Sequence, residues 1–240
     1  MAERLVSLIS GGGTTMEQIG IAIRDGGIPG LEFAGVIASE PGLKGISRAR
    51  ELKMDVPVAV INPLDFVGDD GNADRYGFGQ AILNFAKQQG ATVITQNGWL
   101  PWTPDNVIEA YKDSLFNQHP GPLPETKNLH GVQPHAAMHK FARLTGRYEG
   151  TEVVTHRVAA GMDEGVLVGV RKIPQYFHDW PKKIQQRALP VEHQLQIDML
   201  NQFVKGEIQE TQQESHFMRP GEEKILREAR RYARKRYPNG

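Results

Sequence analysis

The most suggestive chemistry in the sequence is a polar pair, Asn117 and His119, that directly follows the apolar Leu115 and Phe116. Residues i and i+2 of a strand point to the same face, so this amide and imidazole should lie side by side. Pro120 restricts His119 to extended backbone, which favours the same geometry. Two N–H donors aimed at one point can stabilise a developing oxyanion, as acyl transfer requires. We therefore predict a catalytic pair here; a buried structural histidine is the alternative.

A third candidate for the same chemistry is Asp163, in the segment AAGMDEG. Gly161 and Gly165 flank it, which suits a tight loop that brings a carboxylate close to another group. If Asp163 faces His119, it should raise the pKa of the imidazole and relay protons through a water molecule. A solvated turn aspartate is the alternative.

A glycine-rich turn lies between a predicted strand and a predicted helix, and contains Gly11, Gly12, Gly13, Thr14 and Thr15. Backbone N–H groups at a helix N-terminus bind anions, and the threonine hydroxyls add donors. The turn matches neither a Walker loop nor the full GxGxxG fingerprint. A phosphate-binding loop and a simple turn with an N-capping threonine both fit this pattern.

Two further features suggest other functions. His130, His135 and His139 cluster, and the last two are spaced i, i+4 like a metal-binding pair, but there is no HExxH motif and no cysteine. The stretch from Glu222 onward holds seven Lys and Arg residues against three Glu. A charged helix with internal ion pairs explains this stretch, and an RNA-binding tail is the alternative.

The composition is that of an ordinary globular protein, with 39% hydrophobic and 23% charged residues in 240. The formal net charge of zero gives no reason to expect nucleic acid or a membrane as the main partner. The absence of cysteine excludes disulfides and a cysteine nucleophile. Neither a signal peptide nor a membrane-spanning run is evident, so we expect a cytoplasmic protein.

Strand and helix patterns alternate through the first half of the chain. This alternation predicts an α/β fold with a mostly parallel sheet and helices on both faces. The strands are expected near residues 4–10, 31–39, 56–61, 91–95 and 114–118, and the helices near 16–25, 46–54, 74–89 and 104–111. Two further strands near 151–158 and 166–173 predict an antiparallel extension, followed by helices near 183–204 and from 222 onward.

Taken together, LISGGGTTM, FNQHPGPLP, THRVAAGMDEG and VEHQ resemble the folate-dependent formyltransferases, from Leu5 to about Gly206. The resemblance implies a Rossmann-like formyltransferase domain over residues 1–206, followed by a helical tail over 207–240. It implies N10-formyltetrahydrofolate as formyl donor and no metal. Asn117, His119 and Asp163 take the catalytic positions, supported by His156. We also expect small-molecule substrates and a homodimer.

The resemblance also implies where the substrates bind. The glycine-rich turn would hold the phosphate of the acceptor, phosphoribosylglycinamide of purine synthesis, and Glu192 its ribose hydroxyls. The implied folate-binding residues are Arg75, Trp99, Leu100, Pro101, Trp102, Ala160, Gly161, Met162 and Asp163.

The sequence departs from the family pattern near the acceptor, where Thr14 and Thr15 replace a Ser-Asn pair. Two related activities therefore stay open, a sugar-nucleotide N-formyltransferase and a formyltetrahydrofolate hydrolase. A His-dependent metal hydrolase is the alternative from a different class.

Overall fold

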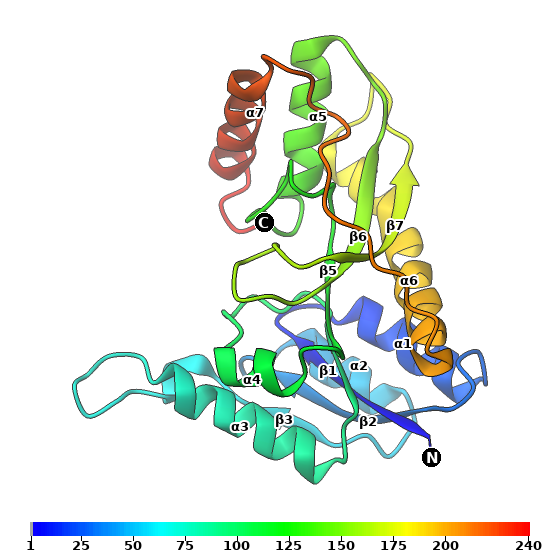
Figure 1. Ribbon diagram of the computed structural model, residues 1–240, viewed down its shortest axis with the longest axis vertical. Helices are drawn as coiled ribbons and strands as arrows, with labels where there is room; N and C mark the ends of the chain where they lie inside the picture. The colour runs from blue at the N-terminus through cyan, green and yellow to red at the C-terminus, as the bar shows by residue number, and fades with distance from the viewer. Residues whose placement is uncertain (1) are drawn as a thin grey trace. The chain divides into compact units, whose positions relative to one another are not determined.

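The computed structural model describes residues 2–240 and contains a seven-stranded sheet in the order β3-β2-β1-β4-β5-β6-β7 (Figure 1). The pairs among β1 to β5 are parallel, whereas β6 and β7 pair antiparallel. The predicted parallel sheet with an antiparallel extension is confirmed. The strands are β1 (Glu3–Ile9), β2 (Leu31–Ala38), β3 (Val58–Val60), β4 (Val93–Gln96), β5 (Leu115–His119), β6 (Thr151–Arg157) and β7 (Leu167–Ile173).

The helices alternate with the strands in the first half, as the sequence predicted. They are α1 (Thr14–Arg24), α2 (Lys44–Glu51), the 3-10 helix η1 (Pro63–Asp65), α3 (Arg75–Gln88), α4 (Asp105–Ala110), α5 (Gln133–Thr145), α6 (Pro181–Lys205) and α7 (Glu223–Arg236). No helix within residues 2–240 combines the length and apolar character needed to cross a bilayer.

The chain forms two compact units. Unit 1 contains the chain up to Asn117 together with Arg157–Ala160 and Gln196–Ile208, and unit 2 contains Gln118–His156, Gly161–Leu195 and Gln209–Gly240. The division into a domain over 1–206 and a tail over 207–240 stays a prediction.

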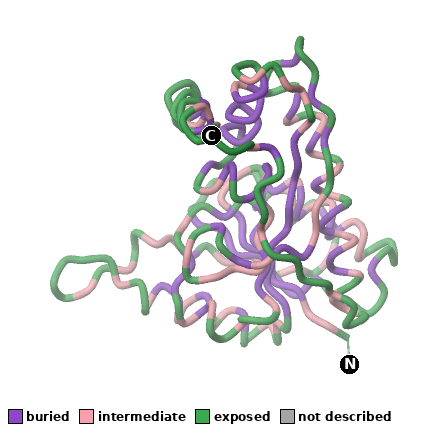
Figure 2. The backbone as a smooth tube through the Cα atoms, turned by 45° about the horizontal axis from the view of Figure 1, so that its top comes forward, coloured by how far each residue is buried: buried purple, intermediate pink, exposed green. Residues whose placement is uncertain are grey.

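Helices cover both faces of the parallel strands in unit 1. Val6 and Leu8 of β1 pack against Phe78 of α3 in one hydrophobic cluster. Ile9 points to the opposite face because side chains alternate along a strand. Gly45 of α2 lies against Ile9 there, since a Cβ at Gly45 would be 2.5 Å from Ile9 Cδ1. Figure 2 shows the buried residues concentrated along the strands.

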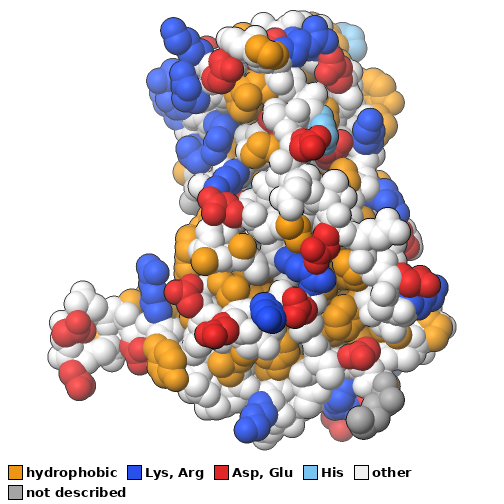
Figure 3. Space-filling model, in the orientation of Figure 1, with side chains coloured by type: hydrophobic (Ala, Val, Ile, Leu, Met, Phe, Trp, Pro, Cys, Tyr) orange, Lys and Arg blue, Asp and Glu red, His pale blue; other side chains and the backbone are white. Residues whose placement is uncertain are grey.

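Unit 2 has two packed layers of its own. The β6–β7 hairpin packs through Val153 and Ile173 against Ile184 and Ala188, in the first half of α6. Helix α7 packs against α5, with its buried Leu226, Ala229 and Ala233 in two clusters with α5 side chains. Its lysines and arginines gather on the outer surface (Figure 3, blue, upper left). The predicted C-terminal helix is confirmed.

Candidate active site

His119, the last residue of β5, is buried and holds a defined hydrogen bond. Its Nε2 atom lies 2.9 Å from the hydroxyl oxygen of Thr126. The Thr126 hydroxyl donates its single hydrogen to the carbonyl oxygen of Pro122, at 2.7 Å. The hydroxyl must therefore accept from His119, which assigns a proton to Nε2. In the neutral ring, Nδ1 then carries the lone pair.

Asp163 lies between two imidazole rings of unit 2. Its Oδ2 is 3.6 Å from Nδ1 of His119, and its Oδ1 is 3.5 Å from Nε2 of His156. The backbone N–H of Asn128 donates to Oδ2 at 2.8 Å. Asp163 has φ of 57°, which is uncommon for a residue other than glycine. The tight loop predicted around Asp163 thus places its carboxylate beside His119.

The charge states follow from burial and these contacts. Burial lowers the pKa of His119 to about 4, although the negative charge of Asp163 acts in the opposite direction. Burial alone would raise the pKa of Asp163, but the hydrogen bond from His156, the charge of His119 and the Asn128 N–H lower it to about 2. At neutral pH the resting site holds a carboxylate beside a neutral His119. Asp163 does raise the pKa of this imidazole, as expected, but burial lowers it by more.

Asn117 lies two residues before His119 in β5, opposite Gln96 of β4. Residues two apart in a strand share a face. Asn117 belongs to unit 1 and His119 to unit 2. Joint action of their side chains stays a prediction.

Glu192 of α6 is buried and is held by Gln118, a residue without a predicted role. The Nε2 atom of Gln118 donates to Glu192 Oε2 at 2.6 Å. Burial raises the pKa of Glu192 to about 7, and the hydrogen bond from Gln118 acts in the opposite direction. The sequence contains one hint of this contact: Gln118 is polar, lies between Asn117 and His119 in a predicted strand, and should face away from both.

The glycine-rich turn joins β1 to α1 and leaves the helix N-terminus without a side-chain cap among the described residues. The capping residue is Gly13, with φ of 68°, so the alternative of an N-capping threonine is wrong. A Cβ at Gly13 would lie 2.7 Å from the Cα of Gly45, so only glycine fits this approach of α2. Gly11 and Gly12 border open space. Uncapped N–H groups beside open space suit an anion.

The predicted folate residues are divided between the two units. Unit 1 holds Arg75, Trp99, Leu100, Pro101, Trp102 and Ala160, and unit 2 holds Gly161, Met162 and Asp163.

In unit 1, Trp99 is buried and stacks on Phe78, whereas Leu100 and Trp102 are 58% and 41% exposed. The guanidinium of Arg75 lies 6.0 Å from the centre of the Trp102 ring. An exposed indole with a neighbouring cation suits a ligand that has both a flat aromatic ring and a carboxylate.

The histidines at i, i+4 both lie on the buried side of α5. His135 is fully buried, and neither of its ring nitrogens has a hydrogen-bond partner within residues 2–240. Burial lowers its pKa to about 3, and the nearby His119 adds to this effect. In the part of the chain that the structure describes, no group of three or more His, Cys, Asp or Glu side chains is arranged to hold a metal ion.

Comparison with known proteins defines the class to which these features belong. Residues 3–200 match the family model described as formyl transferase. The match covers most of the chain, which therefore belongs to the formyl transferase family.

Several similar proteins are named for one activity. The phosphoribosylglycinamide formyltransferase of Haemophilus influenzae is 23% identical over 206 residues, covering 86% of this chain and 89% of that protein. The Bacillus subtilis enzyme of the same name is 25% identical over 170 residues, covering 70% and 78%. The crystal structure of glycinamide ribonucleotide transformylase 1 from Geobacillus kaustophilus matches with a TM-score of 0.72 and 26% identity, covering 85% of this chain and 100% of that one.

Proposed function

We propose that the protein transfers the formyl group of N10-formyltetrahydrofolate to the primary amine of phosphoribosylglycinamide, in de novo purine biosynthesis. The observation that carries this proposal is the buried arrangement of His119, Asp163 and Thr126 in a chain of the formyl transferase family. The activity for which its relatives are named supports the choice of acceptor. A cytoplasmic location and a homodimer belong to the same proposal.

The donor supplies an activated one-carbon unit at the formyl oxidation level. The attacking amine must lose a proton, and the departing folate nitrogen must gain one. In this proposal His119 takes up that proton at Nδ1, because Nε2 is committed to Thr126. The carboxylate of Asp163, 3.6 Å away, stabilises the imidazolium that forms and passes the proton on through water.

The oxyanion of the tetrahedral intermediate needs donors that are already in position. We assign this donor role to the amide of Asn117, while His119 adds the positive charge that it gains when it takes up the proton. One donor of this kind typically lowers the barrier by about 2.7–4 kcal/mol. The strand geometry of β5, which puts the two residues at i and i+2, supports the assignment.

The acceptor and the folate are assigned to the remaining predicted residues. The uncapped N-terminus of α1, with Gly11, Gly12, Gly13, Thr14 and Thr15, would bind the phosphate. The Glu192 carboxylate would accept from the ribose hydroxyls. The exposed Trp102 with Arg75, together with Met162, would bind the folate.

The decisive experiment incubates purified protein with N10-formyltetrahydrofolate and a panel of amines, and follows the release of tetrahydrofolate. We expect release that depends on phosphoribosylglycinamide. Release without any amine would replace this proposal with a hydrolase, and preference for an amino-sugar nucleotide would replace the acceptor. Amine-independent hydrolysis that chelator treatment abolishes and zinc restores would instead favour the metal hydrolase class.

A further inference from the structure

A short segment between α6 and α7, residues 209–217, makes an unusual set of polar contacts within unit 2. We call it the C-terminal strap. It lies beyond residues 3–200, the part of the chain that matches the family model. Thr211 forms an isolated antiparallel bridge with Leu167, the first residue of β7, through two backbone hydrogen bonds of 2.8 and 2.9 Å. Most residues of the strap are exposed, so its position depends on specific hydrogen bonds rather than on burial.

The strap holds the backbone of the loop that carries Asp163. The side-chain amide of Gln213 donates to the carbonyl oxygens of Asp163, at 2.8 Å, and of Gly165, at 2.7 Å. Asp163 occupies the left-handed region, which residues with a side chain rarely adopt. Such a conformation persists only where surrounding contacts fix it. Gln213 fixes the carbonyl of Asp163 while the Asn128 N–H fixes its carboxylate.

The strap also holds the loop that follows His119. Glu125 is almost fully buried, and its Oε1 accepts from three donors of the strap. These are the hydroxyl of Ser215 at 2.7 Å and the backbone N–H groups of His216 and Phe217 at 3.0 and 3.1 Å. Thr126, the partner of His119, is the next residue in the chain. The strap therefore contacts the two loops that supply Asp163 and Thr126.

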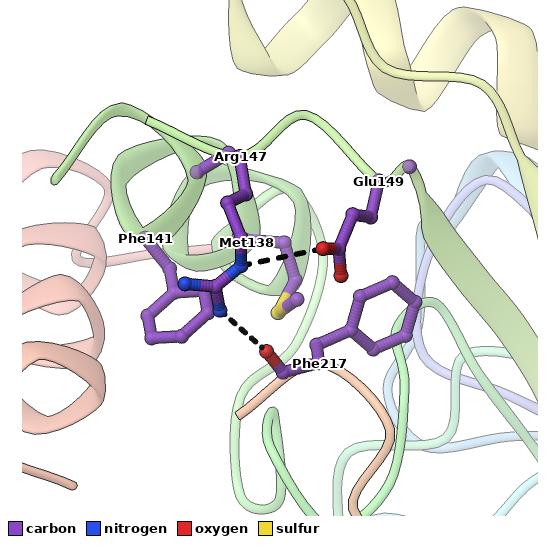
Figure 4. A pocket seen from close by; sticks show the side chains of 7 residues that line it. Met138, Phe141, Arg147, Glu149 and Phe217 are labelled. Atoms are coloured by element: carbon purple, nitrogen blue, oxygen red, sulfur yellow. Dashed lines mark hydrogen bonds and ion pairs between the residues drawn. The ribbon is translucent and has the colours of Figure 1, made fainter. Parts of the chain in front are cut away.

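The far end of the strap packs against α5, where Phe217 helps to line a small pocket. Phe217 lies beside Met138 and Phe141, with Arg147 above them (Figure 4). Arg147 donates to the carbonyl oxygen of Phe217 at 3.1 Å, and its guanidinium also pairs with Glu222, just before α7. These contacts fix the end of the strap, residues 215–217, that donates the hydrogen bonds to Glu125.

We propose that the C-terminal strap is a positioning element for catalysis, with Gln213 as the positioning residue that keeps the Asp163 carboxylate beside His119. The inference rests on the proposed function, because it assigns Asp163 a part in proton transfer. It explains why a segment outside the family region is hydrogen bonded to both loops. Gln213 itself does not touch the reacting groups and acts only through the backbone of Asp163.

The test compares Gln213→Ala and the isosteric Gln213→Glu, which loses the amide donors, with Gln212→Ala as matched control. Gln212 is the exposed neighbour and makes no hydrogen bond within the described chain. We expect kcat to fall roughly tenfold to hundredfold in both Gln213 variants, while KM for each substrate stays within about twofold. Gln212→Ala should match wild type. A kcat within about twofold of wild type in Gln213→Glu overturns the proposal.

Two measurements separate positioning from a general loss of stability and from failure of the proposed function. Activity lost in proportion to Tm, and restored on cooling, would mean that Gln213 only stabilises the fold, which overturns the proposal. Amide hydrogen exchange at Asn128, whose N–H binds the Asp163 carboxylate, needs no substrate. Faster exchange in Gln213→Ala than in Gln212→Ala is expected even if phosphoribosylglycinamide is not the acceptor, and unchanged exchange overturns the proposal.

Discussion

Thr126 fixes the proton of His119 through one hydroxyl group that accepts from the imidazole at 2.9 Å while donating to the Pro122 carbonyl. Nδ1 is the ring nitrogen that faces Asp163, at 3.6 Å from Oδ2. Because the proton of the neutral ring is on Nε2, Nδ1 has none. Because the hydroxyl has a single hydrogen, this assignment follows from the hydrogen-bond network itself.

Thr126→Val keeps the shape of the side chain but leaves the Nε2 proton of His119 without an acceptor. A buried donor without a partner costs about 1–3 kcal/mol, so we expect either a lower Tm or a shift to the other tautomer. The wrong tautomer places a proton on Nδ1 and should lower kcat about tenfold or more. Thr126→Ser, which restores the hydroxyl, should recover most of the activity. Equal loss in the serine and valine variants would argue against the role of the hydrogen bond.

Gln118→Leu tests the link between β5 and Glu192. Loss of the hydrogen bond from Gln118 should raise the pKa of Glu192 further above about 7, so that more of it is protonated at neutral pH. We expect KM for the amine acceptor to rise about tenfold, with KM for the folate and kcat little changed, since a hydrogen bond to a charged group contributes about 1.5–3 kcal/mol.

The same variant has a pH signature. The KM defect of Gln118→Leu should shrink as pH rises, because Glu192 ionises again. Gln118→Glu would not serve as control, since it adds a second charge; Glu192→Gln should reproduce the raised KM without recovery at high pH. A defect in folate KM alone would show that Glu192 does not serve the acceptor.

The fold was largely predictable from the sequence because strand and helix periodicities are local. The strand expected over residues 4–10 is β1 (Glu3–Ile9), and the helix expected over 104–111 is α4 (Asp105–Ala110). The polar residues at the ends of strands, together with the glycines around Asp163, were visible for the same reason.

The contacts that tune the site were not predictable, because they join residues far apart in the chain. Gln118 bonds Glu192 across 74 positions, and Gln213 bonds Asp163 across 50. The lowering of the His119 pKa by burial was not predictable, because the depth of burial depends on tertiary packing. The sequence predicted only that Asp163 would raise the pKa of His119.

Buried histidines should make the protein sensitive to acid in a defined window. The pKa of His135 falls from 6.5 to about 3 on folding, so the unfolded chain binds more protons between these values and stability falls as pH drops below about 6.5. Its contribution to the loss between pH 7 and 5 is about 2 kcal/mol. His119, lowered to about 4, acts in the same direction over most of that window.

Denaturant unfolding of His135→Leu at pH 7 and pH 5 checks this prediction. The difference in unfolding free energy between the two pH values should be smaller than in wild type by about 2 kcal/mol, whatever the absolute stability of the variant. His178→Leu replaces an exposed histidine and is the matched control. An unchanged pH difference in His135→Leu would show that His135 is not held neutral in the folded protein.

The measurement that bears most directly on the proposed chemistry is kcat for formyl transfer to phosphoribosylglycinamide in His119→Ala and Asn117→Ala, with folding checked by Tm. If the imidazole and the amide stabilise the oxyanion, and the imidazole moves the proton, each variant should lose about a hundredfold to a thousandfold in kcat while remaining folded. A folded His119→Ala or Asn117→Ala that transfers formyl groups at close to the wild-type rate would contradict the proposed mechanism.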